Sequence, residues 1–144
     1  MATLNPYLNF NGTTEEAFNF YRSVFGGEFL ALMRFSDTDF AEKLPEADRS
    51  KIMHIALAIG KGNMIMATDA LECMGQKLNT GDDISLCLSA DSLEEAERLF
   101  NALSTGGTVT APLKLEFWGD YFGMLKDPFG KQWMITFSPN RTQS

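Results

Sequence analysis

The feature that most constrains the fold of this chain is an internal repeat, because the second half of the sequence follows the same plan as the first. Thr13-Thr14-Glu15-Glu16 and Ser92-Leu93-Glu94-Glu95 each place a hydroxyl three residues before a glutamate, which predicts a capping box at the start of a helix. Each predicted helix ends at a glycine pair, Gly26-Gly27 or Gly106-Gly107, that can take the left-handed conformation of a helix end.

Apolar runs with the lengths of β-strands surround each predicted helix in the same order. One run precedes the helix, one follows it, and two more close the half as a hairpin. The runs are residues 4–10, 28–35, 52–59 and 62–68 in the first half, and 84–90, 108–112, 120–126 and 130–136 in the second. The pattern predicts an α+β fold of two tandem βαβββ modules.

The length of 144 residues is typical of one domain with its own core, so residues 1–144 are expected to form a single domain. Module one is predicted at about 4–70 and module two at about 84–137. A linker at about 71–83 and a tail at 138–144 complete the chain. The polar insert Ser36 to Lys51 has no equally long counterpart in the second half and is expected to be a surface loop or short helix.

The charge of the chain argues against several classes of partner. Twelve Lys and Arg stand against 19 Asp and Glu, for a net charge of −7, which opposes attraction to nucleic acid or to anionic lipid. No run approaches the roughly 18 apolar residues of a membrane helix, and residues 1–11 lack the features of a secretory signal. We therefore expect no nucleic acid, no membrane and a cytoplasmic location.

Four segments carry a resemblance to a known family. They are Pro6-Tyr7-Leu8-Asn9-Phe10, Glu16-Ala17-Phe18-Asn19-Phe20-Tyr21, Phe25-Gly26-Gly27-Glu28-Phe29 and Asp127-Pro128-Phe129-Gly130-Lys131-Gln132-Trp133-Met134. Together they resemble the PhnB-like branch of the vicinal oxygen chelate superfamily, which includes glyoxalases, bleomycin-resistance proteins and extradiol dioxygenases. The resemblance implies that the two βαβββ modules form curved mixed sheets, or half-barrels, around a pocket for a small molecule, commonly in a homodimer.

The same resemblance implies where a metal would be held. Enzymes of the superfamily bind a divalent metal through His, Glu or Gln on the first and last strands of the two modules. Those positions correspond here to Asn5 or its neighbour Pro6, and to Met66, Ser85 and Met134. A thioether is a soft donor that suits Cu(I) and not a hard divalent ion. We therefore expect the usual metal site to be lost and no cofactor to be bound, with a divalent metal at a displaced site left open.

Two residues could still act as an acid–base pair. His54 is the only histidine, the residue type that most often acts as an acid or base in proteins, although a hydrogen-bonded strand histidine is the commoner role of such a residue. Glu116 is the carboxylate that we predict to act with it, and Asp69 and Asp120 are the alternatives. Carboxylates of this kind are more often simply solvated.

The predicted ligand pocket combines aromatic and methionine side chains with the positions of the lost metal ligands. Residues 116–123 concentrate aromatics beside glycines, which favours a pocket wall, although a dimer contact or a core role is about as consistent with them. The predicted pocket residues are Asn5, Met66, Ser85, Phe117, Trp118, Tyr121, Phe122 and Met134.

Two functional hypotheses follow, and whether the chain is an enzyme stays open between them. The first is a protein that binds a small, partly apolar molecule without the usual metal. The second is a lyase, isomerase or dioxygenase-like enzyme that uses a displaced metal or His54 with a carboxylate. Relatives of this branch also carry a ubiquinone methyltransferase label. The sequence argues against that activity, because it has no Gly-rich first turn and no doubly wound α/β pattern.

Overall fold

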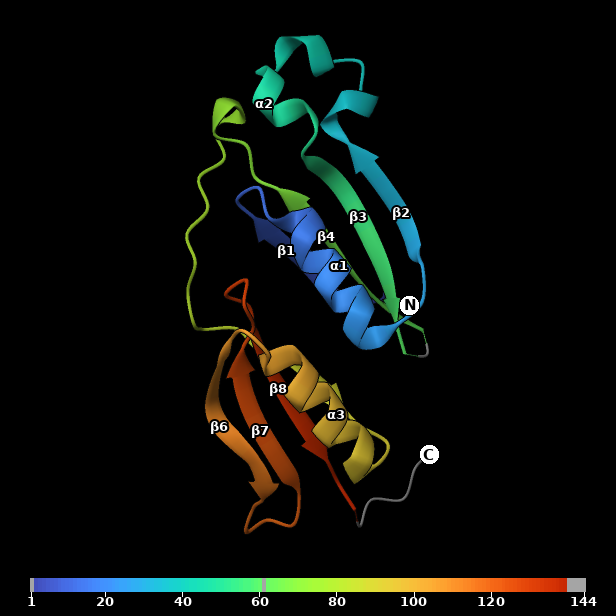
Figure 1. Cartoon of the computed structure of the whole chain (residues 1–144), viewed down its shortest axis with the longest axis vertical. Helices are drawn as coiled ribbons and strands as arrows, with labels where there is room; N and C mark the ends of the chain where they lie inside the picture. Colours follow the sequence, from blue (N-terminus) through green and yellow to red (C-terminus); the bar gives the residue numbers. More distant parts are fainter. Residues whose placement is uncertain (1, 61, 140–144) are drawn as a thin grey trace. The chain divides into compact units, whose positions relative to one another are not determined.

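The computed structural model describes residues 2–60 and 62–139, and the chain divides after Asn79 into two compact units. Residues 140–144 of the predicted tail lie outside the described part. The first unit contains β1 (Tyr7–Phe10), α1 (Thr14–Phe25), β2 (Phe29–Arg34), β3 (Ile52–Ile59) and β4 (Asn63–Asp69). The second contains β5 (Leu86–Ser89), α3 (Leu93–Ser104), β6 (Thr108–Leu115), β7 (Tyr121–Lys126) and β8 (Gln132–Phe137). The predicted α+β fold with two tandem βαβββ modules is confirmed (Figure 1).

Each module folds its strands into one open, four-stranded mixed sheet. The strand order is β1-β4-β3-β2 in the first module and β5-β8-β7-β6 in the second. The first strand pairs in parallel with the last, and the remaining pairs are antiparallel. Tyr7 lies opposite Met66 and Cys87 lies opposite Met134. The last strand of each module is therefore an inner strand, flanked on both sides.

One helix covers one face of each sheet. In the first module, Phe18 and Tyr21 of α1 are fully buried together with Ile55 and Leu57 of β3. The burial of one large apolar side chain contributes about 1.5–3 kcal/mol. Since successive strand residues point to opposite faces, burial of these residues assigns their sequence neighbours to the face opposite the helix.

The second module shows the same packing with a closer approach between helix and sheet. Trp133 and Ile135 of β8 are buried, as is Leu103 of α3. A Cβ atom at Gly123 of β7 would lie 2.6 Å from the Phe100 ring. The same Cβ atom would lie 2.9 Å from Leu113 Cα of β6, so a residue with a side chain at this position would require the Phe100 ring and the β6 backbone to shift.

The helix starts differ between the modules, and one of the two predicted capping boxes is wrong. Ser92 Oγ accepts a hydrogen bond of 3.0 Å from the Glu95 amide, as predicted for α3. Thr13 makes no side-chain cap at α1. Instead Asp69, at the end of β4, accepts hydrogen bonds from the Thr14 amide at 3.1 Å and from its hydroxyl at 2.6 Å. A carboxylate from a distant strand thus replaces the local cap.

Asp69 also ties the start of β3 to this junction. Its second oxygen, Oδ2, accepts a hydrogen bond of 2.8 Å from the Ile52 amide, and the residue is 2% exposed. Buried carboxylates are tolerated when their oxygens are satisfied in this way. Asp69 is therefore neither a solvated surface carboxylate nor a free partner for His54, but a link between α1, β3 and β4.

The second module has a different buried aspartate at its last turn. Asp127 Oδ1 accepts hydrogen bonds from the amides of Phe129 at 2.8 Å and Lys131 at 3.0 Å, and its Oδ2 accepts one of 2.8 Å from the Trp133 indole. This contact fixes the turn between β7 and β8 to the buried tryptophan. Burial lowers the pKa of the Lys131 ammonium, and the charge of Asp127 opposes that shift.

The polar insert of the first module forms short helical segments. These are η1 (Phe35–Asp37), η2 (Ala41–Lys43) and α2 (Glu46–Arg49). Phe35 and Leu44 form a small buried cluster with Leu71, which begins the segment between the modules. Arg34 connects the insert to α1, because it donates a hydrogen bond of 2.8 Å to the Ser50 carbonyl and forms an ion pair with Glu15. The hydrogen bond from Arg34 lowers the pKa of the Glu15 carboxyl.

Substitution of Asp69 by Asn should lower the free energy of unfolding by about 1–3 kcal/mol, because the amide nitrogen cannot accept a bond from a buried donor. The measurement is urea unfolding followed by far-UV circular dichroism, since both tryptophans lie in the second module. Asp39→Asn, at an exposed position of the insert, is the matched control. Equal midpoints for the two variants would contradict the assigned role of Asp69.

Candidate functional site

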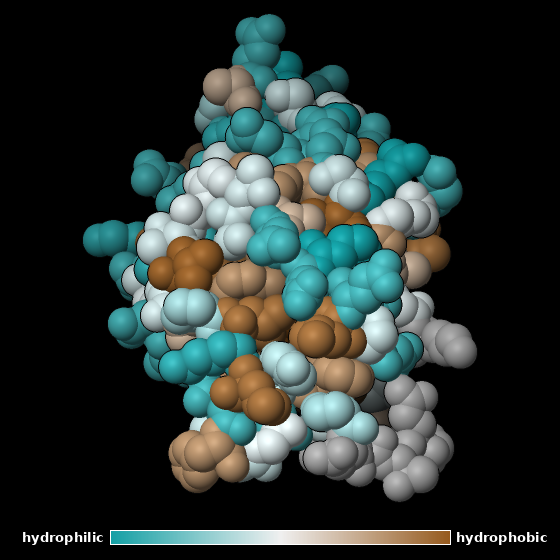
Figure 2. Space-filling model, turned by 60° about the horizontal axis from the view of Figure 1, so that its bottom comes forward, coloured by the Kyte–Doolittle hydropathy of each residue, from teal (hydrophilic) through white to brown (hydrophobic). Residues whose placement is uncertain are grey.

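The candidate site is built on the sheet face opposite the helix in each module, which we call the open face. Apolar side chains reach the surface of the molecule in several groups between hydrophilic ones (Figure 2). In the first module the open face carries a cross-strand row in which Tyr7 lies beside Met66 and Met66 beside Ala56. Met33 of β2 lies opposite His54 of β3 on the same face.

His54 meets a tyrosine on this face. The Tyr7 hydroxyl lies 3.4 Å from His54 Nδ1, and the two rings stack with their centroids 5.9 Å apart. His54 is partly exposed, and Tyr7 is 46% exposed. The predicted histidine therefore contacts Tyr7, a residue that the sequence did not point to as part of a site. The predicted pairing of His54 with Glu116 joins residues of the two units and stays a prediction.

The second module presents sulfur and hydroxyl side chains on its open face. Cys87 lies beside Met134, and Met134 beside Met124, in one cross-strand row. The next row contains Ser89, Thr136 and Phe122, and the Ser89 and Thr136 hydroxyls are 3.4 Å apart.

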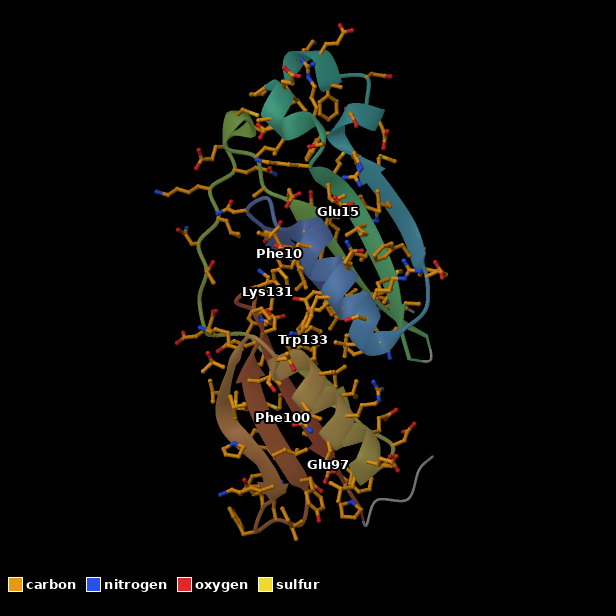
Figure 3. All side chains as sticks on the ribbon, viewed as in Figure 1. Phe10, Glu15, Glu97, Phe100, Lys131 and Trp133 are labelled. Atoms are coloured by element: carbon orange, nitrogen blue, oxygen red, sulfur yellow. The ribbon has the colours of Figure 1, made fainter. Side chains whose placement is uncertain are left out.

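The burial pattern assigns these side chains to the open face. Trp133, the neighbour of Met134, is 1% exposed and lies on the helix side of β8. Gly123, the neighbour of Met124, faces Phe100 of α3. Phe100 on the helix and Trp133 on the sheet are labelled in Figure 3. Cys87 is exposed.

The aromatic run predicted as a pocket wall is divided by the hairpin between β6 and β7. Trp118 packs edge-on against Phe122 with ring centroids 6.0 Å apart, and against Phe117 at 5.0 Å. Phe117 is 96% exposed and Trp118 is 52% exposed. Tyr121 stacks instead on Phe137, its in-register partner, at 6.2 Å. Trp118 and Phe122 are thus brought together beside the open face, whereas Tyr121 contacts a different ring.

Glu116 closes the same hairpin through its backbone. Its amide donates a hydrogen bond of 2.8 Å to the Asp120 carbonyl, and its carbonyl accepts one of 3.0 Å from Gly119. Gly119 takes a φ of 98°, a conformation that glycine adopts without strain. The backbone of Glu116 therefore shapes the turn that carries Phe117 and Trp118.

The strand register identifies which first-strand residues neighbour the two predicted methionines. Met66 and Met134 both lie on inner strands, and their partners are Tyr7 and Cys87. Asn5 and Ser85, the positions predicted from the resemblance, precede β1 and β5. Sequence reasoning missed Tyr7 and Cys87 because a small slip along a strand is invisible until the pairing register is known.

The donors at these positions do not fit a hard divalent metal. Mg²⁺ and Mn²⁺ are bound mainly by carboxylate and other oxygen donors, and Zn²⁺ by imidazole, carboxylate or thiolate, whereas the central residue of each row is a methionine. Within residues 2–60 and 62–139, no three His, Cys, Asp or Glu side chains gather in a group that could hold a metal ion.

A small cavity lies where β5 and β8 end. It has a volume of about 270 Å³ and is lined by Ser89, Ala90, Asp91 and residues 136–139. Ser89 and Thr136 therefore belong both to the lining of this cavity and to the open face of the second module.

Across the described residues, no helix is long and apolar enough to cross a membrane.

Comparisons with known proteins match nearly the whole chain. A family model described as 3-demethylubiquinone-9 3-methyltransferase matches residues 2–136. The protein YjdN of Escherichia coli strain K12 is 31% identical over 140 residues, covering 92% of this chain and 92% of that protein.

Solved structures agree with these sequence matches. The protein PA1353 of Pseudomonas aeruginosa is 38% identical with a TM-score of 0.84, covering 96% of this chain and 98% of that one. A putative 3-demethylubiquinone-9 3-methyltransferase, PhnB protein, of Bacillus cereus is 26% identical with a TM-score of 0.76, covering 95% and 100%. Less similar structures of glyoxalase and bleomycin-resistance family proteins share the fold.

The two tryptophans should differ sharply in their access to solvent, because Trp118 is 52% exposed and Trp133 is 1% exposed. Acrylamide quenching of the fluorescence should show one accessible and one protected component. Trp118→Phe should remove the accessible component and leave the protected one. A Trp118→Phe variant that is still readily quenched would contradict the described position of the hairpin.

Proposed function

The chain belongs to the PhnB-like branch of the vicinal oxygen chelate superfamily, and from that premise we propose that it binds a small, partly apolar molecule on an open sheet face. The observation that carries this proposal is the pair Met66 and Met134. Both occupy inner strands and lie on the open face of their module. A thioether is apolar and flexible, so it adapts to ligands of irregular shape.

The second module offers the fuller set of contacts for such a ligand. Met124 and Met134 provide apolar surface, and Phe122 with the exposed Trp118 provides flat aromatic faces. The Ser89 and Thr136 hydroxyls, 3.4 Å apart, supply a polar contact beside them. Sites for small organic molecules commonly combine mostly apolar walls with a few polar groups. The ligand class supported is an aromatic or aliphatic molecule with one or two hydrogen-bonding groups.

Loss of the usual divalent-metal site is part of the proposal. A protein of this fold that bound its ligand through a hard metal would need oxygen or imidazole donors at the centre of each open face. Methionine at both central positions supports a ligand that is held by packing against the thioethers and by hydrogen bonds to neighbouring side chains, without a metal. The homodimer and the cytoplasmic location expected from the sequence stay predictions.

A second candidate function is acid–base catalysis, and one contact favours it. His54 and Tyr7 lie within 3.4 Å on the open face of the first module, and both side chains can give or take a proton. Such a pair supplies the proton-transfer groups that a lyase or isomerase uses. The carboxylate predicted to complete it, Glu116, is not needed for the contact between His54 and Tyr7.

Methyl transfer, which the description of the family model mentions, is not part of the proposal. Each module has a four-stranded sheet with a single parallel pair. A doubly wound parallel sheet with a Gly-rich first turn, the arrangement that holds nucleotide cofactors in many enzymes, is a different topology.

The apolar surface can be tested with Nile red, a neutral dye that fluoresces on contact with apolar groups. The full chain should bind it, and Met134→Glu should weaken the affinity at least about tenfold, since a carboxylate resists desolvation against the dye. Met74→Glu, at a half-exposed position of the η3 segment (Glu72–Met74), should leave the affinity unchanged. Equal affinities for the two variants would reject the proposed surface.

Titration with Mn²⁺, Ni²⁺ and Zn²⁺ tests the metal-free part of the proposal. We expect no binding of one equivalent that depends on His54, because among the described residues His54 does not gather with two other His, Cys, Asp or Glu side chains in a group that could hold a metal ion. Isothermal titration calorimetry of the full chain and of His54→Ala provides the measurement. Tight binding of one equivalent that disappears in His54→Ala would reject metal-free binding and favour the metalloenzyme.

A further inference from the structure

Three sulfur-bearing side chains lie side by side on the open face of the second module. They come from three adjacent strands: Cys87 from β5, Met134 from β8 and Met124 from β7. From this row we propose that the second module binds a soft monovalent metal ion, Cu(I). The proposal goes beyond the proposed function, because it concerns a metal ion and needs no organic ligand.

The register brings the three side chains within reach of one ion. Cys87 is paired with Met134, and Met134 with Met124, so they form a single row without an offset. Side chains opposite each other on antiparallel strands, such as Met134 and Met124, have Cβ atoms about 4.5–5.5 Å apart, and the parallel strands that carry Cys87 and Met134 are spaced about 4.7–4.9 Å apart. The two methionines have long, unbranched side chains. Their sulfur atoms can therefore approach the Cys87 sulfur above the middle strand.

The row is also accessible from outside the module. Cys87 is exposed, and the two methionines are partly exposed. Trp133 and Gly123, their sequence neighbours, occupy the helix side of the sheet. The three sulfur-bearing side chains are therefore not buried in the core of the module.

The donor chemistry selects the metal. Thiolate and thioether ligands favour Cu(I), whereas carboxylate, carbonyl and water oxygens favour Mg²⁺, Ca²⁺ and Mn²⁺. Binding replaces the thiol proton of Cys87 with Cu(I) and releases that proton, while both methionines donate a sulfur lone pair. No oxidation or reduction takes place in this step. The thiolate neutralises the charge of the ion, and the chain's net charge of −7 attracts cations.

The chain contains its own comparisons for this row. The matching row of the first module is Tyr7, Met66 and Ala56, which has one sulfur atom in place of three. The second cysteine, Cys73, lies in η3, where its sulfur is 3.5 Å from Asp48 Oδ2. Sulfur content alone therefore does not define the site, whereas the alignment of Cys87, Met134 and Met124 does.

The test is a competition for Cu(I) between the reduced full chain and bicinchoninate under anaerobic conditions. One equivalent should transfer to the protein. Cys87→Ser should weaken the affinity at least about 100-fold, since it removes the only anionic donor, and Met134→Leu and Met124→Leu should each weaken it about tenfold or more. Cys73→Ser and Met66→Leu are the matched controls and should retain the parental affinity. Circular dichroism checks that every variant is folded.

Three results would overturn the proposal. The first is an unchanged affinity in Cys87→Ser, and the second is a loss in Cys73→Ser as large as that in Cys87→Ser. The third is an unchanged affinity in both methionine variants, which would reject the three-sulfur site in favour of a lone thiol. The outcome is separable from that of the proposed function, because Met134→Leu removes the thioether but keeps the apolar surface that Nile red requires.

Discussion

Each module has one long helix and one sheet, so the helix can bury only one of the two sheet faces. The strand residues that meet the helix are large and apolar, as Ile55, Leu57 and Trp133 show. The alternation of side chains along a strand then places every second residue on the open face. The chemical character of that face is therefore set by residues that the core does not need, including His54, Met66 and Met134.

Two buried aspartates secure this arrangement in different ways. Asp69 connects the end of β4 to the start of α1 and β3, whereas Asp127 fixes the β7–β8 turn to Trp133. Both use charge-assisted hydrogen bonds to satisfy donors that burial would otherwise leave unpaired. The two modules share a topology, yet they do not share the polar contacts that stabilise it.

The sequence predicted the βαβββ order because the apolar runs, the glycine pairs and the Ser92 cap are local signals. The predicted cap at Thr13 is wrong because the acceptor, Asp69, lies on a strand that only tertiary structure brings to the helix. The roles of Tyr7 and Cys87 could not be read from the sequence for a related reason. Which first-strand residue lies beside Met66 or Met134 depends on the pairing register, which no local signal specifies.

The division of the aromatic run shows the same limit at the candidate site. Residues 117–122 contain four aromatic side chains that the sequence alone does not distinguish. The tight turn at Gly119 places Trp118 against Phe122, whereas Tyr121 stacks on Phe137. Composition could identify this segment as rich in contact surface. Only the hairpin geometry separates the rings that accompany the open face from the ring that does not.

The parallel pairing of the first and last strands has a consequence for how the chain is made. Because β1 pairs with β4, and β5 with β8, neither module can complete its sheet until its final strand has been synthesised. During translation the first strand of each module therefore stays without its parallel partner strand until a helix and three further strands have emerged from the ribosome. The first module has all of its strands once Asp69 has emerged, before any strand of the second exists. The two modules can therefore fold one after the other during synthesis, and each completes its sheet when its last strand has emerged.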